Sequence, residues 1–153
     1  MARKAHPLQA AVQVAQAREE EAAKRLTESQ QRLAEQQHRV QQLMLFRGEY
    51  ATQFQNEGGG ISARRFRDYS AFLNNLDLGI TQSRHQLERL QQEIQRRRQE
   101  WVQTHAKTKA LEEVLARDLK ACARREDQRE QRDSDERNLR GSSARKADLE
   151  DGG

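Results

Sequence analysis

The sequence contains very few residues that interrupt helices or cross-link a fold. Its only proline is Pro7 and its only cysteine is Cys122. Without a later proline, no residue of that type kinks or ends a helix after the first turn. A single cysteine excludes an internal disulfide framework and fits a reducing compartment. β-Branched and aromatic residues are scarce as well, which disfavours strands.

Apolar residues are too few to fill a globular core. Leu, Ile, Val and Phe together make up under a fifth of the 153 residues. Low apolar content is typical of disorder when the net charge is high, but the net charge here is only +4. Ala, Glu, Lys, Leu and Arg make up just over half of the chain, which is typical of long helices and coiled coils.

Long hydrophobic segments are missing too. The longest run of large apolar residues covers only 43–46, far less than a membrane span needs. Arg3 and Lys4 are followed by Ala-rich sequence interrupted by glutamines, which does not form the core of a secretory signal. We therefore expect a soluble cytoplasmic protein with no segment inserted in a membrane.

A seven-residue repeat of apolar positions runs through two segments of the chain, as in the core of a coiled coil. We label its two core positions a and d. In the first segment, a is Val12, Glu19, Leu26, Leu33, Val40, Arg47 and Phe54, and d is Leu8, Ala15, Ala22, Ser29, Gln36, Leu43 and Tyr50. In the second, a is Phe66, Leu73, Ile80, Leu87, Ile94, Trp101, Thr108, Leu115 and Cys122, and d is Tyr69, Leu76, Ser83, Leu90, Arg97, Thr104, Leu111 and Asp118.

A glycine cluster separates the two segments. Gly58, Gly59 and Gly60 predict the end of one helix and a turn, and Ser62 is suited to cap the next helix. The expected fold is all-α: an antiparallel coiled-coil hairpin over 1–137, with helices at about 7–55 and 63–137 and a turn at 56–62. Residues 138–153 are expected to be a disordered polar tail. With the turn near Gly59, residue i should face a residue near 118 minus i.

The residues that could carry chemistry show no catalytic pattern. The four histidines are widely separated, so no pair has metal-ligand spacing. The glycine cluster follows a helix and lacks the Lys-Ser/Thr of a phosphate-binding loop. Cys122 occupies a core position, where a small buried side chain is expected rather than a nucleophile. We expect no enzyme activity, no metal and no cofactor.

Two basic clusters leave nucleic-acid binding open as an alternative. Residues 64–67 place three arginines around Phe66, and 96–98 place three more before Trp101. Arginines beside aromatic rings can grip single-stranded nucleic acid. Acidic residues such as Asp68 and Glu100 are interleaved with them, which favours a solvated helix face. We therefore expect no nucleic-acid partner.

The aromatic residues are concentrated beside the predicted turn. Six of the seven lie within 14 residues of Gly59: Phe46, Tyr50, Phe54, Phe66, Tyr69 and Phe72. Tyr50, Phe54, Phe66 and Tyr69 occupy core positions and are expected to fill the core there. Phe46 and Phe72 lie outside the core positions and should face each other. An exposed aromatic pair on a polar surface is a plausible anchor for a partner.

The same region resembles the FliJ family of the flagellar type III export apparatus. The resemblance is carried by Gly60-Ile61-Ser62 and the downstream residues Phe66, Tyr69, Phe72-Leu73, Leu76 and Ile80-Thr81-Gln82, together with the upstream residues Leu43, Phe46, Glu49 and Tyr50. It covers roughly residues 40–85 at the level of motifs. Length, hairpin layout and the Gln-rich basic composition agree over the rest.

The resemblance implies a non-catalytic coiled-coil stalk that couples the export ATPase ring to the export gate. Its implied partners are that ring, the large gate membrane protein on its cytoplasmic side, and the export chaperones. We predict that the surface that meets the gate, called the tip patch below, consists of residues that the facing rule groups along one stretch near the turn: Leu43, Phe46, Tyr50, Phe72 and Leu76, flanked by Gly79. The implied location is the cytoplasm, peripherally associated with the inner face of the cell membrane. The equivalent stalk of a virulence type III secretion system stays open as an alternative.

Overall fold

The computed structural model describes residues 6–57 and 59–151. Two helices account for nearly all of them: α1, Pro7–Asn56, and α2, Ala63–Asp151. The described residues contain no strand. The expected all-α fold, with two long helices packed against each other, is confirmed.

His6 caps the start of α1. Its ring Nδ1 accepts a hydrogen bond from the Leu8 backbone N–H at 3.1 Å, and its carbonyl accepts one from the Gln9 N–H at 2.9 Å. These bonds satisfy two of the amide donors that a helix leaves free at its first turn. Pro7 has no N–H to satisfy and has a dihedral preset for the first helical position. The cap therefore combines a proline that the sequence identifies with a histidine that it does not.

The chain divides into two compact units, which we describe separately. The hairpin unit is Ala15–Ala106. The flanking unit consists of the described residues on either side of it, 6–14 and 107–151.

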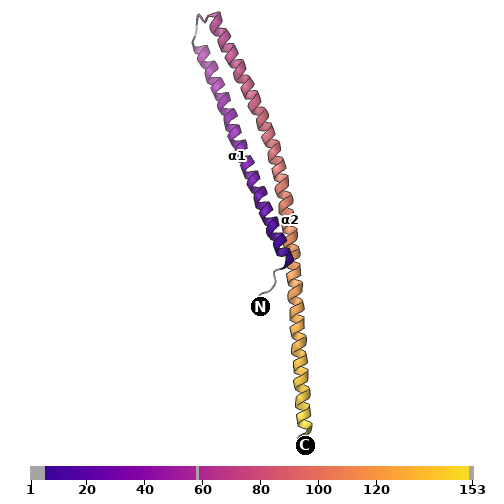
Figure 1. Cartoon of the computed structure of the whole chain (residues 1–153). Helices are drawn as coiled ribbons and strands as arrows, with labels where there is room; N and C mark the ends of the chain where they lie inside the picture. Colours follow the sequence, from indigo (N-terminus) through magenta and orange to yellow (C-terminus); the bar gives the residue numbers. More distant parts are fainter. Residues whose placement is uncertain (1–5, 58, 152–153) are drawn as a thin grey trace. The chain divides into compact units, whose positions relative to one another are not determined.

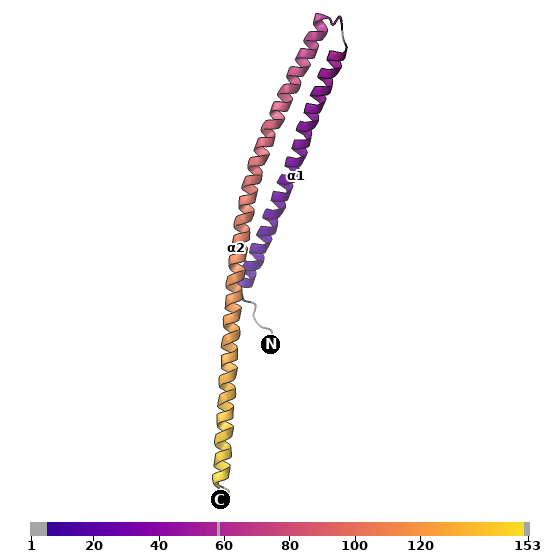
Figure 2. The same cartoon turned by 180° about the vertical axis from the view of Figure 1, so that it is seen from behind.

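In the hairpin unit, α1 and α2 lie side by side and run in opposite directions from the turn (Figure 1), as the view from behind also shows (Figure 2). Every predicted a and d position of this unit is buried or half-buried except Phe66. The most deeply buried apolar side chains are Ala15, Ala22, Val40, Ile80 and Ile94. The heptad pattern therefore locates the core of the hairpin, because only these positions face the other helix.

The turn contains glycines in the left-handed conformation, as the sequence predicts. Gly59 and Gly60 have φ angles of 84° and 85°, in the left-handed region that side chains disfavour. Gly58 lies outside the described residues. Ser62 caps α2, because its Oγ accepts a hydrogen bond from the Arg65 N–H at 3.2 Å. An ion pair between Glu57 and Arg65 joins the two sides of the turn.

In the flanking unit, the first residues of α1 pack against α2. Val12 and Thr108 are buried, and Leu8, Leu111 and Leu115 are half-buried. The His6 Nε2 atom lies 3.5 Å from an Asp118 carboxylate oxygen.

Cys122 corrects one expectation. The repeat predicts it as a small buried side chain, but it is exposed. Every residue from 119 to 150 is exposed, and α1 begins only at Pro7. A heptad position is buried only where another helix faces it. His6, directly before α1, contacts Asp118, so Cys122 lies one turn of α2 past the start of α1.

α2 also ends later than the sequence predicts. Its expected end is near residue 137, whereas the helix continues to Asp151. The segment contains no proline and is rich in Arg, Ala, Glu and Lys, which are strong helix formers. Disorder of residues 138–153 in solution stays a prediction, because a helix without packing is only marginally stable in water.

Candidate partner-binding site at the tip of the hairpin

The six aromatic residues beside the turn form one cluster across both helices. The rings of Phe54 and Tyr69 stack with centroids 3.6 Å apart, and those of Tyr50 and Tyr69 lie 5.4 Å apart. Phe72 lies 4.5 Å from Tyr50 and 6.2 Å from Phe46. The expected pairing of Phe46 with Phe72 is confirmed. Such contacts join the ends of the two helices through large apolar areas.

The rings of the cluster differ in solvent exposure. Phe46 and Phe72 are 48% and 39% exposed, as expected for residues outside the core positions. Phe66 corrects an expectation, because it occupies a core position and yet is 57% exposed. It lies in the first turn of α2, and its nearest ring, Phe54, is 6.3 Å away and only half-buried. The core is therefore incomplete next to the turn.

The tip patch occupies a single flank of the hairpin. Leu43, Tyr50 and Leu76 are d positions and are half-buried. Phe46, Phe72 and Gly79 lie one position before an a residue, at the position called g. In an antiparallel pair of helices, the d and g residues of both chains face the same side. The structure therefore brings the six predicted residues together as a surface along this d/g flank.

Gly79 leaves a gap in that flank. A Cβ atom built on it meets no other atom within 4 Å, and its φ is not in the left-handed region. The backbone there does not require glycine, so helix geometry alone does not explain the residue. What glycine supplies here is open space on the flank, one turn of α2 beyond Leu76.

An ion pair lies on the opposite flank of the hairpin, which is formed by the a and e positions, at the level of the tip patch. Arg47 Nε lies 2.5 Å from Asp77 Oδ1, and its NH2 group lies 3.3 Å from Oδ2. This bidentate hydrogen bond holds the pKa of Asp77 below its usual value and raises the pKa of Arg47. The sequence shows Arg47 as a charged residue at a core position but does not show its partner. Asp77 follows Leu76 at the position called e. An arginine at an a position of one helix and a carboxylate at an e position of the facing helix are the sequence signal for such a pair.

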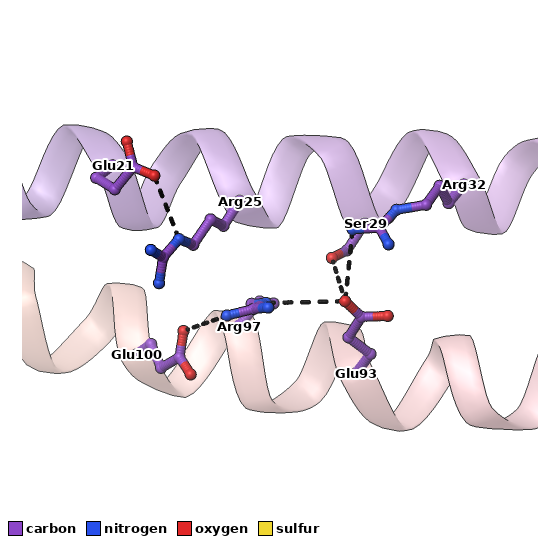
Figure 3. A network of polar contacts seen from close by, with 7 residues as sticks. All are labelled: Glu21, Arg25, Ser29, Arg32, Glu93, Arg97 and Glu100. Atoms are coloured by element: carbon purple, nitrogen blue, oxygen red, sulfur yellow. Dashed lines mark hydrogen bonds and ion pairs between the residues drawn. The ribbon is translucent and has the colours of Figure 1, made fainter.

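Further along the hairpin unit, polar residues replace apolar ones in the core. Ser29 is fully buried, and Figure 3 shows its hydroxyl directed at the Glu93 carboxylate, 3.4 Å away. Arg32 and Arg97 approach the same carboxylate oxygen at 3.5 and 3.9 Å. Seven residues from Ser29, buried Gln36 donates a hydrogen bond from Nε2 to the Ser83 carbonyl at 3.0 Å. These bonds satisfy groups whose burial would otherwise be unfavourable.

This polar network does not resemble a catalytic centre. Its arginines and carboxylates pair with one another along the helix surface: Arg97 with Glu100 at 3.1 Å, and Arg25 with Glu21 at 3.3 Å (Figure 3). Among the described residues, no group of His, Cys, Asp and Glu side chains could hold a metal ion. A search of the same residues finds no helix apolar and long enough to cross a membrane. The feature of this hairpin that points to a partner is its aromatic tip.

Fold and site together define a class of protein: a two-helix coiled-coil hairpin with an exposed aromatic pair beside its turn. The chain belongs to the FliJ family, since the family model described as flagellar FliJ protein matches residues 4–147 of the sequence. No curated protein and no solved structure matches the chain. Family membership assigns the chain in general terms to flagellar protein export, in a family of non-enzymatic export components.

Proposed function

We propose that this protein is the coiled-coil stalk that couples the flagellar export ATPase ring to the export gate and also handles export chaperones. It works in the cytoplasm, against the inner face of the cell membrane. Family membership supports export in general. The matched family is the flagellar one, which favours this branch over the virulence secretion systems.

The observation that carries the proposal is the exposed pair of Phe46 and Phe72. Large aromatic rings that are about half exposed on a polar helical surface are typical of interaction sites, because burying them against a partner is favourable. The tip patch groups this pair with Leu43, Tyr50, Leu76 and Gly79. We assign the patch to the gate, as the family resemblance implies.

The ATPase ring is assigned to the flanking unit. There α2 presents a fully exposed helical surface from 119 to 150, in which acidic and basic residues are interspersed. Charges of this kind can pair with charges lining a ring, each exposed pair contributing under about 1 kcal/mol. Many weak contacts distribute the binding energy, so single substitutions in this segment have small effects.

The proposal is tested by separating the two partners. A variant with Phe46→Ala and Phe72→Ala should lose binding to the purified cytoplasmic region of the gate protein and keep binding to the ATPase ring. Equal binding of the variant and the wild type to the gate region contradicts the assignment of the tip patch.

A further inference from the structure

The d/g flank that carries the tip patch continues beyond it with a different chemistry. One heptad further from the turn than Phe46 and Phe72, the corresponding positions hold Arg39 and Gly79. Arg39 begins a row of arginines at seven-residue spacing: Arg39, Arg32, Arg25 and Arg18, all of them exposed. Phe46 and the arginine row therefore lie along one face of α1, with Phe72 and Gly79 beside them on α2.

Arg39 is the member of this row nearest the tip patch, and its charge is available. Arg32 lies 3.5 Å from Glu93, and Arg25 lies 3.3 Å from Glu21. Within the ranges 6–57 and 59–151, no carboxylate forms an ion pair with Arg39. The α2 position level with it is Gly79, which carries no side chain and has open space around it. The flank thus offers an apolar surface and, one heptad further from the turn, a gap on α2 next to an unneutralised guanidinium on α1.

We propose that this flank receives a helix of the gate protein, which packs as a third helix on the hairpin and carries an acidic residue that pairs with Arg39. The proposal rests on the function proposed above and adds the chemistry of the partner's segment. Apolar side chains of that helix cover Phe46 and Phe72. Its carboxylate lies one heptad along, about 10 Å away at 1.5 Å per residue, and its backbone passes closest at Gly79.

A helix fits this flank better than the other occupants. The exposed groups repeat every seven residues, which is the spacing at which a third helix of a coiled coil presents its side chains. A nucleic acid needs several free cations to hold successive phosphates, whereas Arg25 and Arg32 are already paired with carboxylates. On the opposite flank, at the level of the tip patch, Arg47 and Asp77 already neutralise each other, so that flank offers no free charge at this level from these two residues.

Two substitutions in the full chain test the proposal by affinity for the purified cytoplasmic region of the gate protein. Arg39→Glu should weaken binding about tenfold, and Arg39→Gln about threefold, as expected for an exposed charge pair. Arg39→Gln should also flatten the dependence of affinity on salt. The matched control is Arg98→Gln, which removes an exposed arginine of α2 at an e position, on the opposite flank, and should leave affinity unchanged.

Gly79→Leu tests the gap by steric means. A Cβ atom added at Gly79 meets no other atom of the free chain within 4 Å, and leucine favours a helix more than glycine does, so the midpoint of thermal unfolding should rise. Binding to the gate region should nevertheless fall at least about tenfold, because the side chain fills the space that the partner's backbone occupies. Gly48→Leu is the matched control, because Gly48 is an equally open helical glycine outside the d/g flank. It should bind normally.

The outcomes separate this inference from the function on which it rests. If the double Phe46→Ala, Phe72→Ala variant binds the gate region normally, the proposed function fails. If that variant loses binding while Arg39→Glu and Gly79→Leu both bind normally, the function stands and the third-helix proposal is wrong. The proposal is also overturned if Arg39→Glu reduces binding of a 20-nucleotide single-stranded DNA but not of the gate region.

Discussion

The hydroxyl of Ser29, a fully buried residue of α1, lies 3.4 Å from the Glu93 carboxylate of α2. A serine in a coiled-coil core is less favourable than leucine, because little apolar area is buried. Glu93 compensates by accepting from the hydroxyl and by lying near Arg32 and Arg97. A polar core contact of this kind can fix the register of two helices. Ser29 and Glu93 are 64 residues apart in sequence, so their contact joins the two helices of the hairpin.

Loss of the Glu93 carboxylate should therefore lower stability. Glu93→Ala leaves the buried Ser29 hydroxyl and two arginines without this acceptor, and we expect the free energy of unfolding to fall by about 1 kcal/mol. Urea unfolding followed by circular dichroism measures the change. Glu88→Ala is the control, because Glu88 is far more exposed and its contact with His85 is 3.8 Å long. Equal losses in the two variants would show that the Glu93 contacts contribute nothing specific.

The hairpin itself is tested by a distance within the hairpin unit. Spin labels at Glu20 and Arg98 should lie within about 20–25 Å of each other, roughly two helix diameters. A single continuous helix would place them about 120 Å apart. Double electron–electron resonance distinguishes these values directly, and the longer distance is incompatible with a turn at 57–62.

The Arg47 and Asp77 ion pair should make stability depend on pH in the acid range. The folded-state pKa of Asp77 is lowered from 3.8 by its hydrogen bond to Arg47. The unfolded chain therefore takes up the proton first as the pH falls, so the stabilisation is present above the unfolded pKa and disappears as the pH falls through the folded one. Asp77→Asn should thus be less stable than the wild type near neutral pH and approach it at acid pH.

Thermal unfolding of both proteins across pH 2–7, a range chosen to bracket the ordinary carboxyl pKa of about 4, measures this convergence. Arg47→Gln should show the same convergence, because it removes the other partner of the same hydrogen bond. A constant difference between the wild type and Asp77→Asn over the whole range is the contrary result, and would mean that the ion pair does not form in solution.

The sequence predicts the hairpin well because one physical rule dominates it. Positions a and d face the other helix wherever one is present, so their burial follows from spacing alone. The rule fails for Cys122, which lies past the start of α1, and for Phe66, which lies next to the turn. Cys122 lies where the repeat continues past the start of α1, whereas Phe66 lies opposite the last turns of α1, where the core next to the turn is incomplete. Sequence periodicity shows which side of a helix is apolar, not where its partner ends.

The tip patch is predicted less completely, for a different reason. Exposure of Phe46 and Phe72 and their mutual contact follow from heptad position. The partners of charged residues do not: Arg47 could pair with several carboxylates, and only the structure selects Asp77. Similarly, the cap formed by His6 depends on a ring nitrogen near the Leu8 N–H. Such contacts depend on rotamers and on fractions of a turn, which periodicity does not specify.

Removal of the flanking unit should separate stalk folding from ATPase coupling. A chain lacking residues 1–13 and everything after 110 keeps nearly all of the core of the hairpin unit and should remain helical by circular dichroism. It should no longer stimulate ATP hydrolysis by the ring, since the exposed charged surface of α2 is gone. Undiminished stimulation would refute the assignment of this unit to the ATPase.

The tip patch gives the decisive prediction. Phe46 and Phe72 lie outside the core positions and are about half exposed, so replacing both by alanine removes contact area without opening the core. Their rings do touch each other and Tyr50, and we expect a loss of about 1–2 kcal/mol in the free energy of unfolding. Helicity and binding to the ATPase ring should be retained. Leu43, Tyr50 and Leu76 are poorer test positions, because they are also core residues.

Binding of this double variant to the gate region should weaken by about 2 kcal/mol or more, which is roughly thirtyfold or more in affinity, as for other aromatic anchors truncated to alanine. Flagellar protein export in cells should fail in parallel. Leu45→Ala is the matched control, since Leu45 is 67% exposed and adjacent to Phe46 but faces away from the d/g flank. If the control and the double variant bind the gate equally well, the aromatic cluster serves only to join the ends of the two helices.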